Sequence, residues 1–209
     1  MKILAHRGHW REPAEKNTLA AFERAWSAGY GIETDLRDLG GSIVVSHDLP
    51  QIGAMDFETL LQAYAAQGKQ TPLALNIKAD GLQKAVAHQL EKYQVADYFV
   101  FDMSVPDSLA YLRSGMSTFL RLSEFEPWTV LHDNIAGIWL DAFTGRWWTL
   151  DDVRAITKQG RKAAIVSAEL HGRQHEELWQ ALQQLEPETK AELLLCTDFP
   201  EDAERYFAA

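Results

Sequence analysis

Two acidic residues in the first quarter of the sequence have the spacing of neighbours on one face of a strand. They are Glu33 and Asp35, in the run Gly31-Ile32-Glu33-Thr34-Asp35. Residues i and i+2 of a strand point to the same side, so the two carboxylates would repel each other. A bound cation relieves that repulsion, and oxygen ligands favour Mg²⁺ or Ca²⁺ over Zn²⁺. The alternative is a pair neutralised by a basic side chain of the protein, Arg7, Arg37 or Lys78.

A second i, i+2 pair occurs in Leu75-Asn76-Ile77-Lys78. It offers a neutral carbonyl oxygen from Asn76 and an ammonium group from Lys78 on one side of a strand. Such a pair beside two carboxylates suits a site that holds both a cation and an anionic ligand. The alternative is that Lys78 only pairs with Glu33 or Asp35, while Asn76 satisfies a neighbouring loop.

Two histidines, His6 and His47, follow short apolar runs in the same part of the sequence, and each precedes a charged residue, Arg7 or Asp48. Imidazoles titrate near neutral pH, so two of them beside a scissile bond can act in turn as base and acid. A single histidine is more often an ordinary hydrogen-bonded residue, and the other five have that interpretation here, although His171 lies close enough to a predicted strand end to contact a substrate.

The elements that must position these residues alternate between short apolar runs and longer segments of helical periodicity, as in βα units with a parallel sheet. Eight strands are predicted, and no Gly-x-Gly-x-x-Gly follows the first. This favours a minimal α/β (β/α)8 TIM barrel over an open doubly wound sheet, with residues 1–209 as one domain. The predicted strands are 3–6, 31–36, 73–78, 98–102, 118–122, 137–141, 163–167 and 192–197, with seven helices at 18–28, 57–67, 82–93, 106–113, 150–159, 174–184 and 201–207.

Polar residues gather at the predicted carboxyl ends of these strands, where barrel active sites are built. The later strands end near Asp102, Arg121, Asp141, Glu169 and Asp198. For any single one of these, the first solvated residue of a loop or a helix cap is the better explanation. The collective pattern, with both charge signs at one end of the strands, favours a site.

Composition limits the classes of partner. With 20 Lys and Arg against 30 Asp and Glu, the net charge of −10 disfavours nucleic-acid binding and stable membrane association. The one cysteine, Cys196, excludes an intrachain disulfide and fits a reducing compartment. The first residues do not resemble a signal peptide. We therefore expect a cytoplasmic protein whose partner is a small molecule.

Four motifs together resemble the glycerophosphodiester phosphodiesterase family of the phospholipase C-like phosphodiesterase barrels. In chain order they are His6-Arg7-Gly8, Asn17-Thr18-Leu19-Ala20-Ala21-Phe22, Gly31-Ile32-Glu33-Thr34-Asp35 and Val44-Val45-Ser46-His47-Asp48. The resemblance continues more thinly through Asn76-Ile77-Lys78 to Cys196-Thr197-Asp198-Phe199-Pro200. Four linked motifs are far more specific than any one of them.

The resemblance implies a reaction and roles for the matching residues. It implies hydrolysis of a phosphodiester to an alcohol and a phosphomonoester with one divalent cation, Mg²⁺ or Ca²⁺, and with an adjacent substrate hydroxyl as a possible internal nucleophile. His6 and His47 would be the general acid and base. The implied metal ligands are Glu33 and Asp35, and the implied phosphate contacts are Arg7 and Lys78.

The sequence departs from the family pattern on the third predicted strand and in the segment that follows His47. Asn76 stands where the family usually has glutamate, which removes a negative charge from the metal site; Asp102 is a candidate ligand that would restore it. Only 24 residues separate Asp48 from Leu73, too few for the capping subdomain often inserted there.

Tryptophans in the predicted loops offer a substitute for the missing cap. Trp147, with Trp148, Trp128 and Trp10, lies where an aromatic ring would stack on a sugar, a base or a choline-like cation. We predict that Trp147 and Arg121 bind substrate. Trp26, Trp139 and Trp179 have the spacing of core residues.

Two further functions fit the same sequence. The missing third carboxylate also suits a repurposed, non-catalytic barrel that binds a phosphorylated ligand. A lyase-like enzyme of this barrel type would instead stop at a cyclic phosphate.

Overall fold

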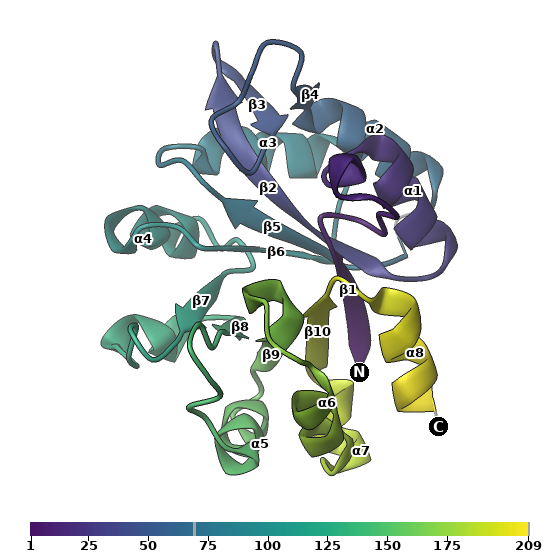
Figure 1. The fold of residues 1–209 in the computed structure, drawn as a ribbon. Coiled ribbons are helices and arrows are strands. Elements are labelled where there is room, and N and C mark those ends of the chain that lie inside the picture. The colour runs from purple at the N-terminus through teal and green to yellow at the C-terminus, as the bar shows by residue number, and fades with distance from the viewer. Residues whose placement is uncertain (69, 209) are drawn as a thin grey trace. The chain divides into compact units, whose positions relative to one another are not determined.

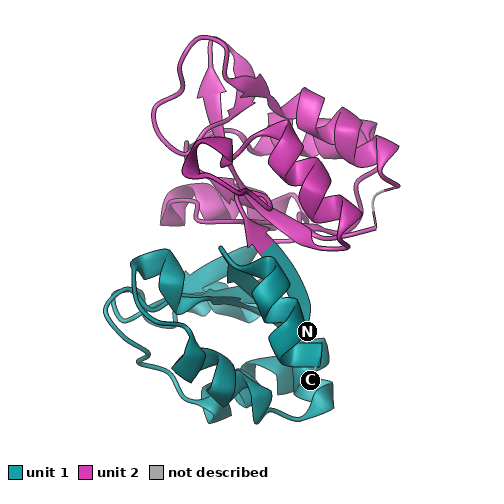
Figure 2. Cartoon of the chain, turned by 45° about the vertical axis from the view of Figure 1, so that its right-hand side comes forward, with its two compact units in different colours: residues 1–4, 119–209 teal, residues 5–118 magenta. Residues whose placement is uncertain are grey.

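The computed structural model describes residues 1–68 and 70–208. The chain divides into two compact units, which Figure 2 shows in different colours. Unit 1 comprises residues 1–4 and 119–209, and unit 2 comprises residues 5–118. Strand β1 (Lys2–His6) gives its first residues to unit 1 and its last two to unit 2. This division does not test the predicted single domain, which stays a prediction.

Unit 2 holds the sheet that carries the acidic motif. Parallel pairing joins β2 to β5 and β5 to β6, and β2 continues past the motif into an antiparallel hairpin with β3, which pairs with β4 (Figure 1). Val100 also pairs in parallel with Thr118. The elements are β2 (Gly31–Leu39), β3 (Ser42–Val45), β4 (Met55–Asp56), β5 (Leu73–Ile77), β6 (Tyr98–Phe101), η1 (Pro13–Glu15), α1 (Leu19–Ser27), α2 (Phe57–Ala66), α3 (Gln83–Lys92) and α4 (Val105–Arg113).

Unit 1 repeats the alternation of strand and helix. Strands β7, β8, β9 and β10 pair in that order, and all the pairs are parallel. The elements are β7 (Phe119–Leu122), η2 (Val130–Asn134), β8 (Gly137–Leu140), α5 (Leu150–Lys158), β9 (Lys162–Val166), η3 (Ala168–His171), α6 (Glu176–Gln183), α7 (Pro187–Ala191), β10 (Leu193–Thr197) and α8 (Pro200–Ala208).

The eight predicted barrel strands and seven predicted helices are all present, with boundaries that differ by at most three residues. The connection from β7 to β8, for which no helix was predicted, forms the single 3-10 turn η2. The short helix α7 was not predicted, because its five residues have no apolar stripe and none of them is buried. The described residues between Asp48 and Leu73 form only β4 and α2, as expected without a capping subdomain.

Helix α1 shows how local sequence and packing agree. The Thr18 hydroxyl caps the helix by accepting a hydrogen bond from the backbone N–H of Ala21. The apolar stripe places Phe22 and Trp26 in the core of unit 2, where the Trp26 ring lies 5.4 Å from the Tyr64 ring of α2. The predicted core tryptophans Trp26, Trp139 and Trp179 are all buried.

In the described part of the chain, none of the helices is both long and apolar enough to cross a membrane.

Gly137 of β8 provides a test of the packing in unit 1. A Cβ atom at this position would lie 2.4 Å from the buried ring of Phe119 on the neighbouring strand. We predict that Gly137→Ala lowers the free energy of unfolding by about 1–3 kcal/mol, the usual effect of overpacking a core. Urea denaturation of the two proteins measures the difference.

Gly145→Ala is the matched control, because nothing lies within 4 Å of a Cβ atom there. Phe119→Leu in the Gly137→Ala background should recover part of the loss. An unfolding free energy that Gly137→Ala leaves unchanged would contradict the packing described here.

Candidate active site

The loop after β1 is bent sharply onto β2. Arg7 has a positive φ of 57°, and its backbone N–H donates to the Glu33 carbonyl at 2.9 Å. Gly8 follows with a φ of 89°, and a Cβ atom there would lie 2.8 Å from Cβ of Ala21. Position 8 therefore requires glycine for two reasons: its φ angle is unfavourable for other residues, and α1 approaches too closely for a side chain. This bend carries the Arg7 side chain to the acidic motif.

Glu33 and Asp35 lie side by side on β2 and are almost completely buried, with 2% and 1% of their surface exposed. Parallel pairing sets Asp35 opposite Asn76 of β5, which in turn stands opposite Phe101, the residue before Asp102. The Asn76 side-chain amide is also buried, and its Nδ2 donates to Glu33 Oε1 at 3.4 Å. Sheet register thus brings together the residues predicted as metal ligands.

Two basic side chains face this acidic pair. Arg7 Nε lies 3.5 Å from Asp35 Oδ2, and Lys78 Nζ lies 3.7 Å from Asp35 Oδ1 and 3.1 Å from Asp102 Oδ2. The sequence also allowed an acidic pair neutralised by basic side chains of the protein. The structure shows this in part, because Arg7 and Lys78 both lie within 4 Å of Asp35. Arg37 is directed elsewhere, because its guanidinium donates to the backbone carbonyls of His47 and Lys78.

Three buried oxygen atoms of the same cluster have no hydrogen-bond partner among the residues that the structure describes: Glu33 Oε2, Asp35 Oδ1 and Asn76 Oδ1. Buried polar atoms are normally hydrogen-bonded, so three such atoms on adjacent strands need an explanation. Two carboxylate oxygens and one amide oxygen are the donors that Mg²⁺ and Ca²⁺ prefer, so these residues fit a divalent cation. The described residues include no group of three or more His, Cys, Asp or Glu side chains that could hold a metal ion. In this cluster the third oxygen comes from the amide of Asn76, beside the two carboxylates.

Burial and the neighbouring Asp35 charge raise the pKa of Glu33 to about 8, against the lowering effects of Arg7, Lys78 and Asn76. An isolated buried carboxylate is costly, and a like charge beside it adds to the cost. The bare cluster therefore favours a protonated Glu33 at neutral pH. A cation would reverse this preference, because an opposite charge stabilises the ionised form.

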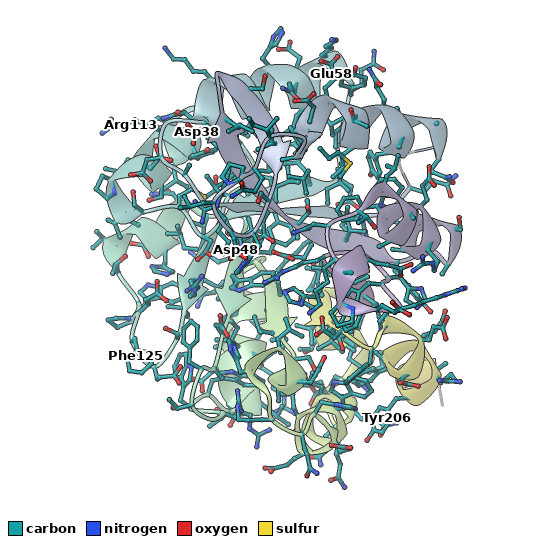
Figure 3. All side chains as sticks on the ribbon, turned by 45° about the horizontal axis from the view of Figure 1, so that its top comes forward. Asp38, Asp48, Glu58, Arg113, Phe125 and Tyr206 are labelled. Atoms are coloured by element: carbon teal, nitrogen blue, oxygen red, sulfur yellow. The ribbon has the colours of Figure 1, made fainter. Side chains whose placement is uncertain are left out.

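The two predicted catalytic histidines occupy different positions in unit 2. His6, at the end of β1, lies with its Nε2 3.9 Å from Glu33 Oε2, and its backbone carbonyl accepts from the Trp10 indole. His47 follows β3, and its Nδ1 lies 2.9 Å from Oδ1 of the exposed Asp48, which Figure 3 labels. Its loop is tied to the motif because the Ser46 N–H donates to the Asp35 carbonyl at 3.0 Å.

Asn17 is a site residue to which the sequence analysis gave no role. Its Nδ2 donates to Asp35 Oδ2 at 2.9 Å, and its Oδ1 accepts from the Thr34 hydroxyl at 2.9 Å. Sequence spacing alone does not relate residue 17 to residue 35. The one indication in the sequence was that Asn17 begins the motif Asn17-Thr18-Leu19-Ala20-Ala21-Phe22.

The remaining predicted substrate-binding residues belong to unit 1. Arg121 contacts Glu126 at 3.6 Å and the buried Asp141 at 3.9 Å, and the Trp147 indole donates to the Asp141 carbonyl at 2.8 Å. Trp147 remains 43% exposed, whereas Trp148 is buried. His171 also contacts Asp141, at 2.7 Å. Substrate binding by Arg121 and Trp147 stays a prediction.

Known proteins resemble this chain in their structures and not detectably in their sequences. No protein-family model matches the sequence, and no curated protein matches it. The fold is similar to a glycerophosphodiester phosphodiesterase from Agrobacterium tumefaciens (TM-score 0.69, 19% identity, covering 100% of this chain and 99% of that chain). It is also similar to a phosphodiesterase from Oleispira antarctica in complex with the product sn-glycerol-3-phosphate (TM-score 0.73, 15% identity, covering 100% and 97%).

A third similar structure is a Ca²⁺-dependent phosphatidylinositol-specific phospholipase C from Streptomyces antibioticus (TM-score 0.60, 13% identity, covering 99% of this chain and 95% of that chain). The three likenesses extend over nearly the whole of every chain. They confirm the predicted fold class, an α/β fold of the TIM-barrel type.

The raised pKa of Glu33 gives a prediction about the cation-free protein, studied in the presence of a chelator. Between the usual Glu pKa of 4.5 and about 8, the unfolded chain ionises Glu33 while the folded chain keeps the proton. Stability is therefore lost as the pH rises through this range. Glu33→Gln removes the ionisation, so its melting temperature should exceed that of the wild type by a margin that grows from pH 5 to pH 8, reaching on the order of 5 °C.

Asp38→Asn is the matched control, since Asp38 lies on the same strand but is exposed (labelled in Figure 3). Its margin over the wild type should stay constant with pH. A Glu33→Gln margin that is equally flat would show that Glu33 titrates normally.

Proposed function

We propose that this chain is a metal-dependent enzyme of the glycerophosphodiester phosphodiesterase family that hydrolyses a small phosphodiester. Its substrate is a glycerophosphodiester, and its products are an alcohol and a phosphomonoester such as glycerol phosphate. The observation that carries the proposal is the group of three buried oxygens without hydrogen bonds, on Glu33, Asp35 and Asn76, next to Arg7 and Lys78. The fold likeness to phosphodiesterases, one of them with bound sn-glycerol-3-phosphate, supports it.

Glu33, Asp35 and Asn76 would hold the divalent cation, with Asp102 as a further candidate. When bound, Mg²⁺ or Ca²⁺ supplies Lewis-acid stabilisation of negative charge on a phosphoryl oxygen. Calcium dependence is stated for the Streptomyces phospholipase, which supports a divalent cation here. Arg7 and Lys78 bind the remaining phosphoryl oxygens and balance the charge that grows on them.

Two histidines move the protons of the reaction. One imidazole removes a proton from the attacking nucleophile as the new P–O bond forms. The nucleophile is either water, which gives the phosphomonoester directly, or an adjacent substrate hydroxyl, which gives a cyclic phosphate that water then opens to the phosphomonoester. The other gives a proton to the alcohol oxygen as its bond to phosphorus breaks. His6 and His47 are the residues that we assign to these roles, since each imidazole lies beside a carboxylate, 3.9 Å from Glu33 Oε2 for His6 and 2.9 Å from Asp48 Oδ1 for His47.

Other parts of the proposal concern the substrate and its surroundings. Arg121 and Trp147 contact the substrate, Trp147 through the exposed part of its ring. The single cysteine, Cys196, supports a cytoplasmic location. The net charge of −10 supports action on a small molecule without binding nucleic acid or staying on a membrane.

A second candidate is a barrel that binds a phosphorylated ligand without cleaving it. Asn76 favours this alternative, because an amide in place of a carboxylate weakens the hold on a divalent cation. The two functions differ in a simple observation, since only an enzyme releases a product.

Phosphorus NMR on a panel of diesters, such as glycerophosphocholine and glycerophosphoethanolamine, tests the reaction. We expect a phosphomonoester signal that disappears with chelator and returns with Mg²⁺ or Ca²⁺. His6→Ala and His47→Ala should each lower kcat by roughly 10²–10⁴-fold. His88→Ala, an exposed histidine of α3, is the control and should leave the rate unchanged.

Three results would contradict hydrolysis. A cyclic phosphate as the final product would identify a lyase, whereas no cleavage combined with a diester-induced rise in melting temperature would identify a binding protein. Full turnover in both histidine variants would remove the assigned roles.

Asn76→Glu should show what the amide does in the cation site. A third carboxylate beside Glu33 and Asp35 adds repulsion in the cation-free protein and attraction for the cation. We predict a lower melting temperature in chelator and a dissociation constant for Ca²⁺ roughly tenfold or more below that of the wild type. Isothermal titration calorimetry and thermal melts measure the two effects. Asn76→Asp, with a shorter side chain, is the companion variant; unchanged affinity in both would place the cation elsewhere.

A further inference from the structure

We propose that Asn17 is a positioning residue that fixes the Asp35 carboxylate so that one of its oxygens, Oδ1, is left for the cation. The inference rests on the proposed function, because it takes Asp35 as a cation ligand. It is carried by hydrogen bonds and backbone geometry within unit 2.

The side chain of Asn17 bridges two successive residues of β2. Its Nδ2 donates to Asp35 Oδ2 at 2.9 Å, while its Oδ1 accepts from the Thr34 hydroxyl at 2.9 Å. Thr34 is completely buried, so its hydroxyl has a fixed position from which to hold the amide. Asn17 and Arg7 Nε, at 3.5 Å, both face Oδ2, whereas Oδ1 has no hydrogen-bond partner within residues 1–68 and 70–208. The two oxygens of Asp35 are thereby made unequal.

The backbone holds Asn17 in place from the other side. Its N–H donates to the Arg7 carbonyl at 2.9 Å, and its φ of 59° is in the left-handed region. Asparagine tolerates this region better than most residues that have a side chain. The next residue, Thr18, caps α1, so Asn17 is fixed between the bend after β1 and the start of a helix. One residue therefore joins Arg7, Thr34 and Asp35.

The Asn17 amide carries both the donor and the acceptor that these two contacts need. The Asp35 carboxylate requires a donor, and the Thr34 hydroxyl is observed donating, so it requires an acceptor. Aspartate at position 17 would set another carboxylate against Asp35 Oδ2 and add repulsion to a cluster that already contains Glu33. Alanine would lose both contacts and would also strain the backbone.

Groups that orient a metal ligand are worth about 10- to 100-fold in metal affinity. Without the Asn17 amide, the Asp35 side chain can rotate and bring Oδ1 toward Lys78 Nζ, now 3.7 Å away. The cation would then compete with this pairing. We therefore expect loss of the Asn17 side chain to weaken cation binding by about 10- to 100-fold.

The experiment is calorimetric titration of Ca²⁺, and separately of Mg²⁺, into wild type and Asn17→Gly. Glycine keeps the left-handed backbone conformation and removes only the side chain. Gln94→Gly is the matched control: Gln94 is another non-glycine residue of unit 2 with a positive φ, 52°, but its side chain is exposed and it should keep wild-type affinity. Thermal melts in chelator verify that each variant is folded.

Thr34→Val supplies a second variant that decides the question if Asn17→Gly does not fold. It removes the hydroxyl that orients the amide and should weaken binding by less than Asn17→Gly does. Wild-type cation affinity in a folded Asn17→Gly variant would overturn the positioning role and leave the proposed function intact. If the glycine variant does not fold, wild-type cation affinity in Thr34→Val would have the same meaning. Absence of Ca²⁺ and Mg²⁺ binding in the wild type would overturn it together with the cation part of the proposed function.

Discussion

The burial of two carboxylates one residue apart on β2 is the constraint on which the rest of unit 2 depends. Removing Glu33 and Asp35 from water while holding them on one face of a strand is unfavourable on both counts. The surrounding groups offset this cost. Arg7 and Lys78 bring positive charge, and Asn17 and Asn76 bring hydrogen-bond donors. These groups offset the cost only in part, because three oxygens of the cluster accept no hydrogen bond from the described part of the chain.

Several features of the fold that are unusual in themselves are explained by this constraint. The positive φ angles of Arg7, Asn17 and Asp102 place the first two against Asp35 and the third within 3.1 Å of Lys78. Such an angle is uncommon for arginine, whereas asparagine and aspartate adopt it more readily, and all three residues lie around one cluster. Gly8 serves the same end by letting α1 approach the bend after β1.

The sequence predicts the elements well because strand and helix periodicity is strong in βα units, and it identifies the acidic pair because i, i+2 spacing on a strand is unambiguous. The hydrogen bond between Asn17 and Asp35 could not be predicted from the sequence. Seventeen residues separate them, and the link depends on a bend that only tertiary packing defines. For Trp148, the sequence favoured a role in the site, whereas the structure buries its ring. Aromatic residues in a predicted loop do not reveal which of two neighbours points inward.

An asparagine rather than a glutamate at position 76 has a physical reason when formal charges are counted over the cluster. With histidines neutral, the ionised carboxylates of Glu33, Asp35 and Asp102 exceed Arg7 and Lys78 by one negative charge. A divalent cation together with a singly charged phosphodiester would bring this cluster to neutrality, whereas a further glutamate would leave it negative. Without the cation, the raised pKa of Glu33 lets a proton supply the missing positive charge. Cation binding would then release that proton, so affinity for the metal would rise with pH toward about 8.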